Sequence, residues 1–97
     1  MNAQGHLDDI TAFMGALPAD EYEQRRRLRT CRNAATHKAS QTTSSDVRAL
    51  CAIVTERAAE WIYAPAEAAV LAEVVKLCRR LLMVADDIET LEARYYG

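Results

Sequence analysis

The residues best suited to chemistry lie in one short stretch, Arg32-Asn33-Ala34-Ala35-Thr36-His37. Histidine exchanges a proton near neutral pH, and arginine carries a permanent charge on a fork that suits phosphate. Together they could cleave RNA without a metal, with His37 as acid or base and Arg32 neutralising charge on the phosphorus centre. The sequence has no serine triad, glycine-rich phosphate loop or metal-spaced His/Cys cluster. We therefore expect neither a metal nor a cofactor.

Basic residues surround this motif. Residues 25–38 carry six Lys or Arg and no acid, whereas residues 1–24 carry five acids and no Lys or Arg. The candidate RNA-binding or partner-binding cations are Arg25, Arg26, Arg29 and Lys38. A polyanion-binding protein is usually basic overall. Because the net charge here is −2, the sequence offers only a basic stripe.

The same stripe has a second interpretation, as a solvated helix face. Glu21–Arg25 and Glu23–Arg27 have the i,i+4 spacing and order that favour ion pairs within a helix. The acidic end of the last helix could neutralise further cations. His37 could then simply interact with the carbonyls at its helix C-terminus.

The elements that position the motif are expected to be helices. The chain is 51% hydrophobic with three Gly and two Pro, and no window alternates apolar and polar residues as a strand does. Apolar spacing predicts helices near residues 7–17, 19–37, 45–63 and 65–95. We expect an all-α, single-domain, four-helix antiparallel bundle with a long C-terminal helix, and we expect it to be dimeric.

The last helix organises this fold. One row of apolar residues recurs at steps of three and four: Val70, Val74, Leu77, Leu81, Ala85, Ile88, Leu91 and Tyr95. A second row widens the stripe: Leu71, Val75, Cys78 and Leu82. Pro65 is expected at the first helical position, which needs no N–H partner, giving a helix of roughly 45 Å. The polar segment 39–45 is expected to be a linker in which Thr43 or Ser44 caps the third helix, Thr43 with Asp46 in a capping box.

The three cysteines and the short apolar runs indicate the compartment. Cys31, Cys51 and Cys78 lie on apolar helix stripes without metal-ligand spacing, so we expect them in the core. An odd cysteine count without a signal peptide favours a reducing cytoplasm. The longest apolar run is too short for a membrane span. We expect a soluble cytoplasmic protein.

The order Arg-Asn-x-x-x-His resembles the signature of the HEPN superfamily (higher eukaryotes and prokaryotes nucleotide-binding domains). The resemblance covers roughly residues 20–63 and includes the Arg-rich helix, the polar loop and the following helix. These all-α modules are often found in toxins and antiviral defence. The resemblance implies a metal-independent endoribonuclease that acts as a homodimer, with Arg32 and His37 catalytic and Asn33 orienting groups nearby. Helix geometry agrees with a dimer, because five residues turn a helix by about 140° and separate Arg32 from His37.

A second class of function stays open beside this one. The apolar stripe between Val70 and Leu82 is wider than the other helices are expected to cover, and leftover apolar surface usually marks an interface. That surface suits a homodimer. It equally suits a small, non-catalytic helical module or inhibitor, of the phage or mobile-element type, that binds another protein through its charged faces and apolar stripe. Whether the protein is an enzyme therefore stays open.

Overall fold

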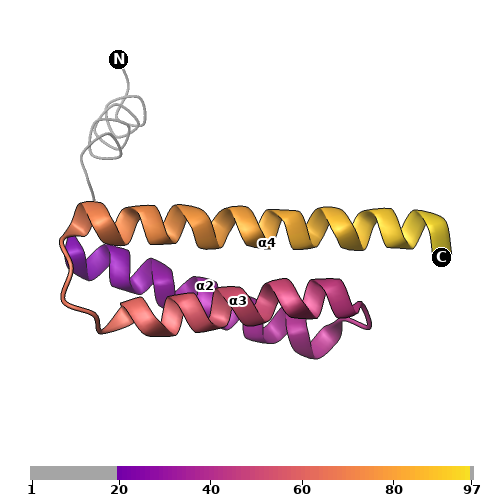
Figure 1. The fold of residues 1–97 in the computed structure, drawn as a ribbon, viewed down its shortest axis with the longest axis horizontal. Helices are drawn as coiled ribbons and strands as arrows, with labels where there is room; N and C mark the ends of the chain where they lie inside the picture. Colours follow the sequence, from indigo (N-terminus) through magenta and orange to yellow (C-terminus); the bar gives the residue numbers. More distant parts are fainter. Residues whose placement is uncertain (1–19, 97) are drawn as a thin grey trace, which may run out of the picture.

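The computed structural model describes residues 20–96, which form three α-helices joined by short connections (Figure 1). They are α2 (Glu21–Gln41), α3 (Ser45–Ile62) and α4 (Ala68–Tyr96). Helices α2 and α4 run in one direction and α3 in the other, and the C-terminal end of α4 extends beyond the other two (Figure 1). No strand occurs in the described part, which confirms the all-α prediction there. The predicted helix at 7–17 lies outside the described residues.

Helix α2 is longer at its C-terminal end than predicted. Asp20 caps its start, where the carboxylate accepts a 2.8 Å hydrogen bond from the backbone N–H of Glu23. The helix continues past His37 to Gln41, and the N–H of Thr42 closes it on the carbonyl of Lys38. The prediction of a linker from residue 39 was wrong because Ala39 packs against the core, which keeps this turn helical.

Helix α3 begins one residue after its cap, Ser44. The Ser44 hydroxyl accepts a 3.2 Å hydrogen bond from the N–H of Val47 and donates to the carboxylate of Glu92 on α4 at 2.9 Å. Ser44 is therefore the N-cap, as one of the two predicted alternatives had it. The other alternative, a capping box of Thr43 with Asp46, was wrong. The helix ends at Ile62, one residue earlier than predicted.

Helix α4 begins at Ala68, so the prediction of Pro65 as its first residue was wrong. Its first turn is closed by the N–H of Leu71 donating to the carbonyl of Glu67 at 3.1 Å. Residues 63–67 form the connection instead. This connection is not helical because Arg25 of α2 binds backbone carbonyls in it and at the end of α3. These hydrogen bonds hold the chain in a turn.

The core lies in the groove between the three helices. Its fully buried side chains include Leu28 and Ala35 of α2, Val54 and Ile62 of α3, and Leu71 of α4. The three cysteines are also in the core, as predicted: Cys31, Cys51 and Cys78. Each helix therefore presents one narrow apolar face to the other two.

The two predicted apolar rows of α4 are covered unequally. The second row carries the core contacts, and Ala85 continues it, so the buried row is Leu71, Val75, Cys78, Leu82 and Ala85. The first row is only partly covered, because α2 and α3 converge beneath the second row. Val70 and Leu77 of the first row are 44% and 47% exposed.

Candidate functional site

The Arg-Asn-x-x-x-His motif lies in the middle of α2. The helix is unbroken through the motif, so Arg32 and His37 diverge by about 140° around its axis. Asn33 and His37 are exposed, whereas Arg32 is half-buried. Within one chain the helix does not turn the two proposed catalytic side chains toward a common point. A ribonuclease site would need groups from elsewhere.

His37 borders a shallow depression between α2 and α4, which we call the acidic depression. Its lining residues are Ala34, His37, Lys38, Gln41, Asp86 and Glu89. Lys38 forms ion pairs with Asp86 and Glu89, the latter at 3.0 Å. The Lys38 ammonium donates hydrogen bonds to the carboxylates of Asp86 and Glu89, and these bonds raise the pKa of Lys38 above its ordinary value. Two carboxylates against one ammonium leave this depression net negative, which opposes a phosphate beside His37.

Arg25 is bound inside the molecule. Its Nη1 donates to the carbonyls of Trp61 at 3.2 Å and Ile62 at 2.6 Å, and its Nη2 donates to the carbonyl of Ala64 at 2.8 Å. Its Nε and Nη2 also donate to Glu21, at 3.0 and 2.6 Å. All three guanidinium nitrogens are therefore engaged, and only 16% of the side chain is exposed.

The remaining predicted cations face outward. Arg26 has a side chain 69% exposed, with a long 3.9 Å contact to Glu23, and Arg29 is partly exposed. The predicted ion pairs Glu21–Arg25 and Glu23–Arg27 are confirmed, at 2.6 and 3.7 Å. Arg26 and Arg29 are thus the predicted binding residues whose charge is most accessible to a ligand.

A second depression between α2 and α4, the basic depression, was missed by the sequence analysis. Its lining residues are Gln24, Arg27, Ala72, Val75, Lys76, Arg79, Arg80 and Met83. The spacing of Lys76, Arg79 and Arg80 on one helix was a usable signal, but only the fold brings Arg27 beside them. Gln24 is 4% exposed, and its side-chain carbonyl has no hydrogen-bond partner. The α2–α4 seam therefore carries one basic and one acidic depression.

The thiols are shielded by the core. Burial raises the pKa of Cys31 and Cys51, and it raises the pKa of Cys78 to about 11. The Arg79 guanidinium, close to Cys31, partly opposes the effect of burial there. Within residues 20–96, no group of three His, Cys, Asp or Glu side chains is placed to hold a metal ion. These thiols are consequently poor nucleophiles at neutral pH.

One flank of α4 remains without a covering element in the described structure. We call it the outer row: Val70, Val74, Leu77, Leu81, Val84, Ile88, Leu91 and Tyr95. Val74, Leu81 and Ile88 are partly buried against the core. The other five are exposed by 44% to 80%. Val84, which replaces Ala85 in this row, was missed because both positions fit a helical spacing.

Comparison of the chain with models of known families, with curated proteins and with solved structures found no match. The HEPN resemblance therefore stays a prediction that depends on the motif and its surroundings. None of the helices described combines the length and the apolar character that crossing a membrane demands. The function is therefore inferred from the geometry of the described residues.

Proposed function

We propose that this protein is a non-catalytic helical module that acts by binding another helical protein surface through the outer row of α4. The observation that carries this proposal is the outer row itself, eight apolar residues of which five are at least 44% exposed. Contiguous apolar surface of this kind usually marks an interface. Completing the burial of five half-exposed side chains supplies roughly 4–7 kcal/mol before the entropy cost of association.

The surroundings of the Arg-Asn-x-x-x-His motif favour a protein-binding function over catalysis. His37 adjoins a net negative depression, and Lys38 is held there by two carboxylates. The guanidinium of Arg25 donates its hydrogen bonds to backbone carbonyls within the protein. A phosphate at His37 would meet carboxylates where cleavage needs cations. The outer row has no comparable obstacle to a partner.

A helix is the partner element that fits this surface. The outer row extends over most of the 29-residue helix α4, which is drawn straight in Figure 1. An amphipathic helix laid along α4 would bury the row with apolar residues at i, i+3, i+4 and i+7.

Site-specific photo-crosslinking tests the proposal. A photoreactive residue replaces Leu77, in the outer row, or Met83, which is 65% exposed and lines the basic depression on the other flank of α4. In its host cell, the full chain should crosslink to a discrete protein species from position 77 and not from position 83. Equal crosslinking from the two positions, or none from position 77, would show that the outer row is not a binding surface.

An RNA-directed function is the second candidate, and the accessible face of α2 favours it. Arg26, Asn33 and His37 are exposed, Arg29 is partly so, and the basic depression adds four cations nearby. In this proposal a HEPN-like homodimer binds or cleaves RNA in a toxin or antiviral-defence setting. Arg32 and His37 act across a cleft between two subunits, and Asn33 orients them.

Substitution of His37 separates cleavage from folding. His37→Ala should abolish any ribonuclease activity with little change in melting temperature, because the side chain is exposed. Ser40→Ala, an exposed change one turn further along the same helix, serves as the matched control and should retain activity. Cleavage that survives His37→Ala would exclude the catalytic assignment.

A further inference from the structure

The outer row of α4 has the spacing of a coiled-coil seam. Its residues follow steps of four and three without interruption from Val70 to Tyr95. This seven-residue repeat places Val74, Leu81, Ile88 and Tyr95 at a positions, and it places Val70, Leu77, Val84 and Leu91 at d positions. The buried row beside it follows the same steps. Helix α4 therefore carries two adjacent seams, of which α2 and α3 fill only one.

The charges beside the outer row alternate. The g positions of the repeat are Glu73, Arg80, Asp87 and Arg94, all exposed. The e positions on the other edge are Leu71, Cys78 and Ala85 of the buried row and Glu92, which is partly buried and accepts a hydrogen bond from Ser44. Interhelical ion pairs of a coiled coil form between e and g positions. In this protein only the g positions can form such interhelical ion pairs.

Resting on the proposed association function, we infer that the partner is a second copy of this chain whose α4 lies antiparallel along the outer row. In one register the two rows pair completely: Val70 with Tyr95 of the second copy, Val74 with Leu91, Leu77 with Ile88, and Leu81 with Val84. Two-fold symmetry repeats each layer, so every member of the row is covered. Apolar residues meet at every layer, with Tyr95 at the two ends.

The g charges favour this register. Antiparallel helices bring g positions together, so Glu73 lies beside Arg94 of the second copy and Arg80 beside its Asp87. The symmetry gives four pairs, all of opposite charge. A shift of one heptad in one direction sets Arg80 against Arg80, and a shift in the other direction sets Asp87 against Asp87. Every g pair in both shifted registers has like charges, which are destabilising.

A parallel pair lacks this complementarity. Each g residue would then face an e residue of the second copy five positions further along. Arg80 would face Ala85, which is buried in its own chain, and Asp87 would face the acidic Glu92. No opposite-charge pair results. The order of charges along α4 therefore supports the antiparallel arrangement alone.

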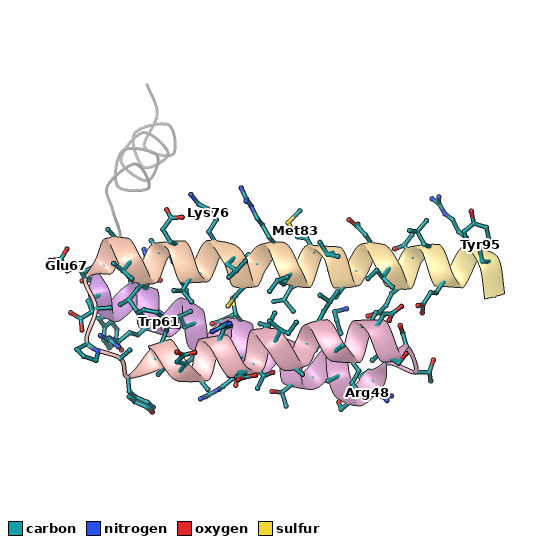
Figure 2. All side chains as sticks on the ribbon, in the orientation of Figure 1. Arg48, Trp61, Glu67, Lys76, Met83 and Tyr95 are labelled. Carbon is teal, nitrogen blue, oxygen red and sulfur yellow. The ribbon has the colours of Figure 1, made fainter. Side chains whose placement is uncertain are left out.

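The antiparallel pair leaves the α2 motif outside the contact. The α4 residues that line the depressions shared with α2 include Lys76, Arg79, Met83 and Asp86. These four lie on the flank of α4 away from the outer row, whereas Arg80, which also lines the basic depression, lies between that flank and the outer row. Figure 2 shows Lys76 and Met83 projecting from the edge of α4 opposite α3. The self-pairing proposed here therefore does not create the two-subunit ribonuclease cleft and is independent of it.

The mass of the full chain in solution is the first test. Sedimentation equilibrium should give twice the 10.8 kDa chain mass. Leu77→Glu should raise the dissociation constant at least roughly a hundredfold, because two buried leucines are replaced in each dimer. Met83→Glu makes the same kind of change on the other flank and should leave the dimer intact. Circular dichroism verifies that both variants remain helical.

A charge exchange tests the register. Arg80→Glu alone and Asp87→Arg alone each create two like-charge contacts per dimer and should weaken it. The double variant R80E/D87R restores two opposite-charge contacts and should recover the wild-type dissociation constant within about threefold. The two positions are seven residues apart, too far to pair within one helix. Failure of the double variant to recover would overturn the register.

Cysteine pairing tests the direction. In the antiparallel dimer, Glu73 of one chain adjoins Arg94 of the other, whereas the two copies of Glu73 lie roughly 28 Å apart along the axis. The double variant Glu73→Cys with Arg94→Cys should form disulfide-linked dimers under mild oxidation. Glu73→Cys alone should not. Val74→Cys alone should not form them either, because its two copies face each other in a parallel pair but lie roughly 25 Å apart along the axis of the antiparallel pair. Crosslinking by Val74→Cys would indicate a parallel pair and overturn the proposal.

The outcomes distinguish this inference from the function on which it rests. A chain that is monomeric at every concentration, yet crosslinks from position 77 to a different protein, would overturn self-pairing and leave the association function standing. A monomer whose position 77 crosslinks only to its own residues 1–19 would overturn both. A dimer that Met83→Glu disrupts and Leu77→Glu does not would also exclude the outer row.

Discussion

At the residue scale, Arg25 joins three parts of the chain. From the second turn of α2, its guanidinium binds the carbonyls of Trp61, Ile62 and Ala64. The last carbonyls of a helix have no partner within the helix. Arg25 supplies donors to those at the end of α3 and fixes where the chain turns toward α4.

Removal of this side chain should be costly. Arg25→Ala should reduce the free energy of unfolding by about 2 kcal/mol, because hydrogen bonds from a charged donor to half-buried carbonyls are lost. Arg26→Ala, one residue along the same helix, should change it by less than about 0.5 kcal/mol, since Arg26 has only a long, exposed contact. Urea unfolding followed by circular dichroism measures both. Equal effects would show that the carbonyl contacts contribute little.

The core thiols predict a pH dependence. The folded state holds the proton of Cys78 up to a pKa of about 11, whereas an unfolded chain releases it near 8.5. Between these values the unfolded state binds fewer protons than the folded state, so stability falls as the pH rises. Urea unfolding from pH 7 to 11 should show this fall. The fall should be shallower in Cys78→Ala, and an equal slope in both proteins would contradict the assignment.

At the element scale, the start of α3 depends on Ser44. Ser44→Ala removes the cap and the hydrogen bond to Glu92 and should lower the unfolding free energy by about 1–2 kcal/mol. Thr43→Ala, at the exposed neighbouring position, should change it by less than about 0.5 kcal/mol. Thermal unfolding of the two variants gives the comparison. A larger loss for Thr43→Ala would assign the cap to Thr43.

The sequence predicted the helices better than their ends. Apolar spacing located α2, α3 and α4 and placed the cysteines in the core, because periodicity follows from which face is buried. The start of α4 could not be predicted, since Pro65 fits a first helical position locally and only the distant Arg25 disfavours it. The end of α2 at Gln41 likewise depends on contacts of Lys38 and Ala39 with other helices.

The assignment of apolar rows shows the same limit. On α4 both rows have helical spacing, so the sequence alone does not say which one α2 and α3 cover. Of the predicted site residues, Arg26, Arg29, Asn33 and His37 are accessible, fully or in part. The neutralisation of a cation by the acidic end of α4 was anticipated, and Lys38 is that cation. The contacts of Arg25 with backbone carbonyls could not be predicted, because they join residues at least 36 positions apart in the chain.

At the scale of the whole molecule, self-pairing would couple folding to concentration. A ligand that binds only the folded state stabilises it by mass action, and a second copy acts in the same way. The melting temperature of the wild-type chain should therefore rise with protein concentration. That of Leu77→Glu should stay constant over the same range, as scanning calorimetry can show. A constant wild-type value would argue against a dimer at those concentrations.

The contacts of Arg25 also set an order of events during synthesis. The ribosome adds Ala64 thirty-nine residues after Arg25, so α2 leaves the exit tunnel well before the carbonyls that its guanidinium binds. Helices α2 and α3 can associate while the chain is still growing, but their relative position is secured only once the segment beyond Ile62 has emerged. A pause in translation after α3 has emerged, but before the segment beyond Ile62 has done so, would leave a nascent helix pair with one end still open.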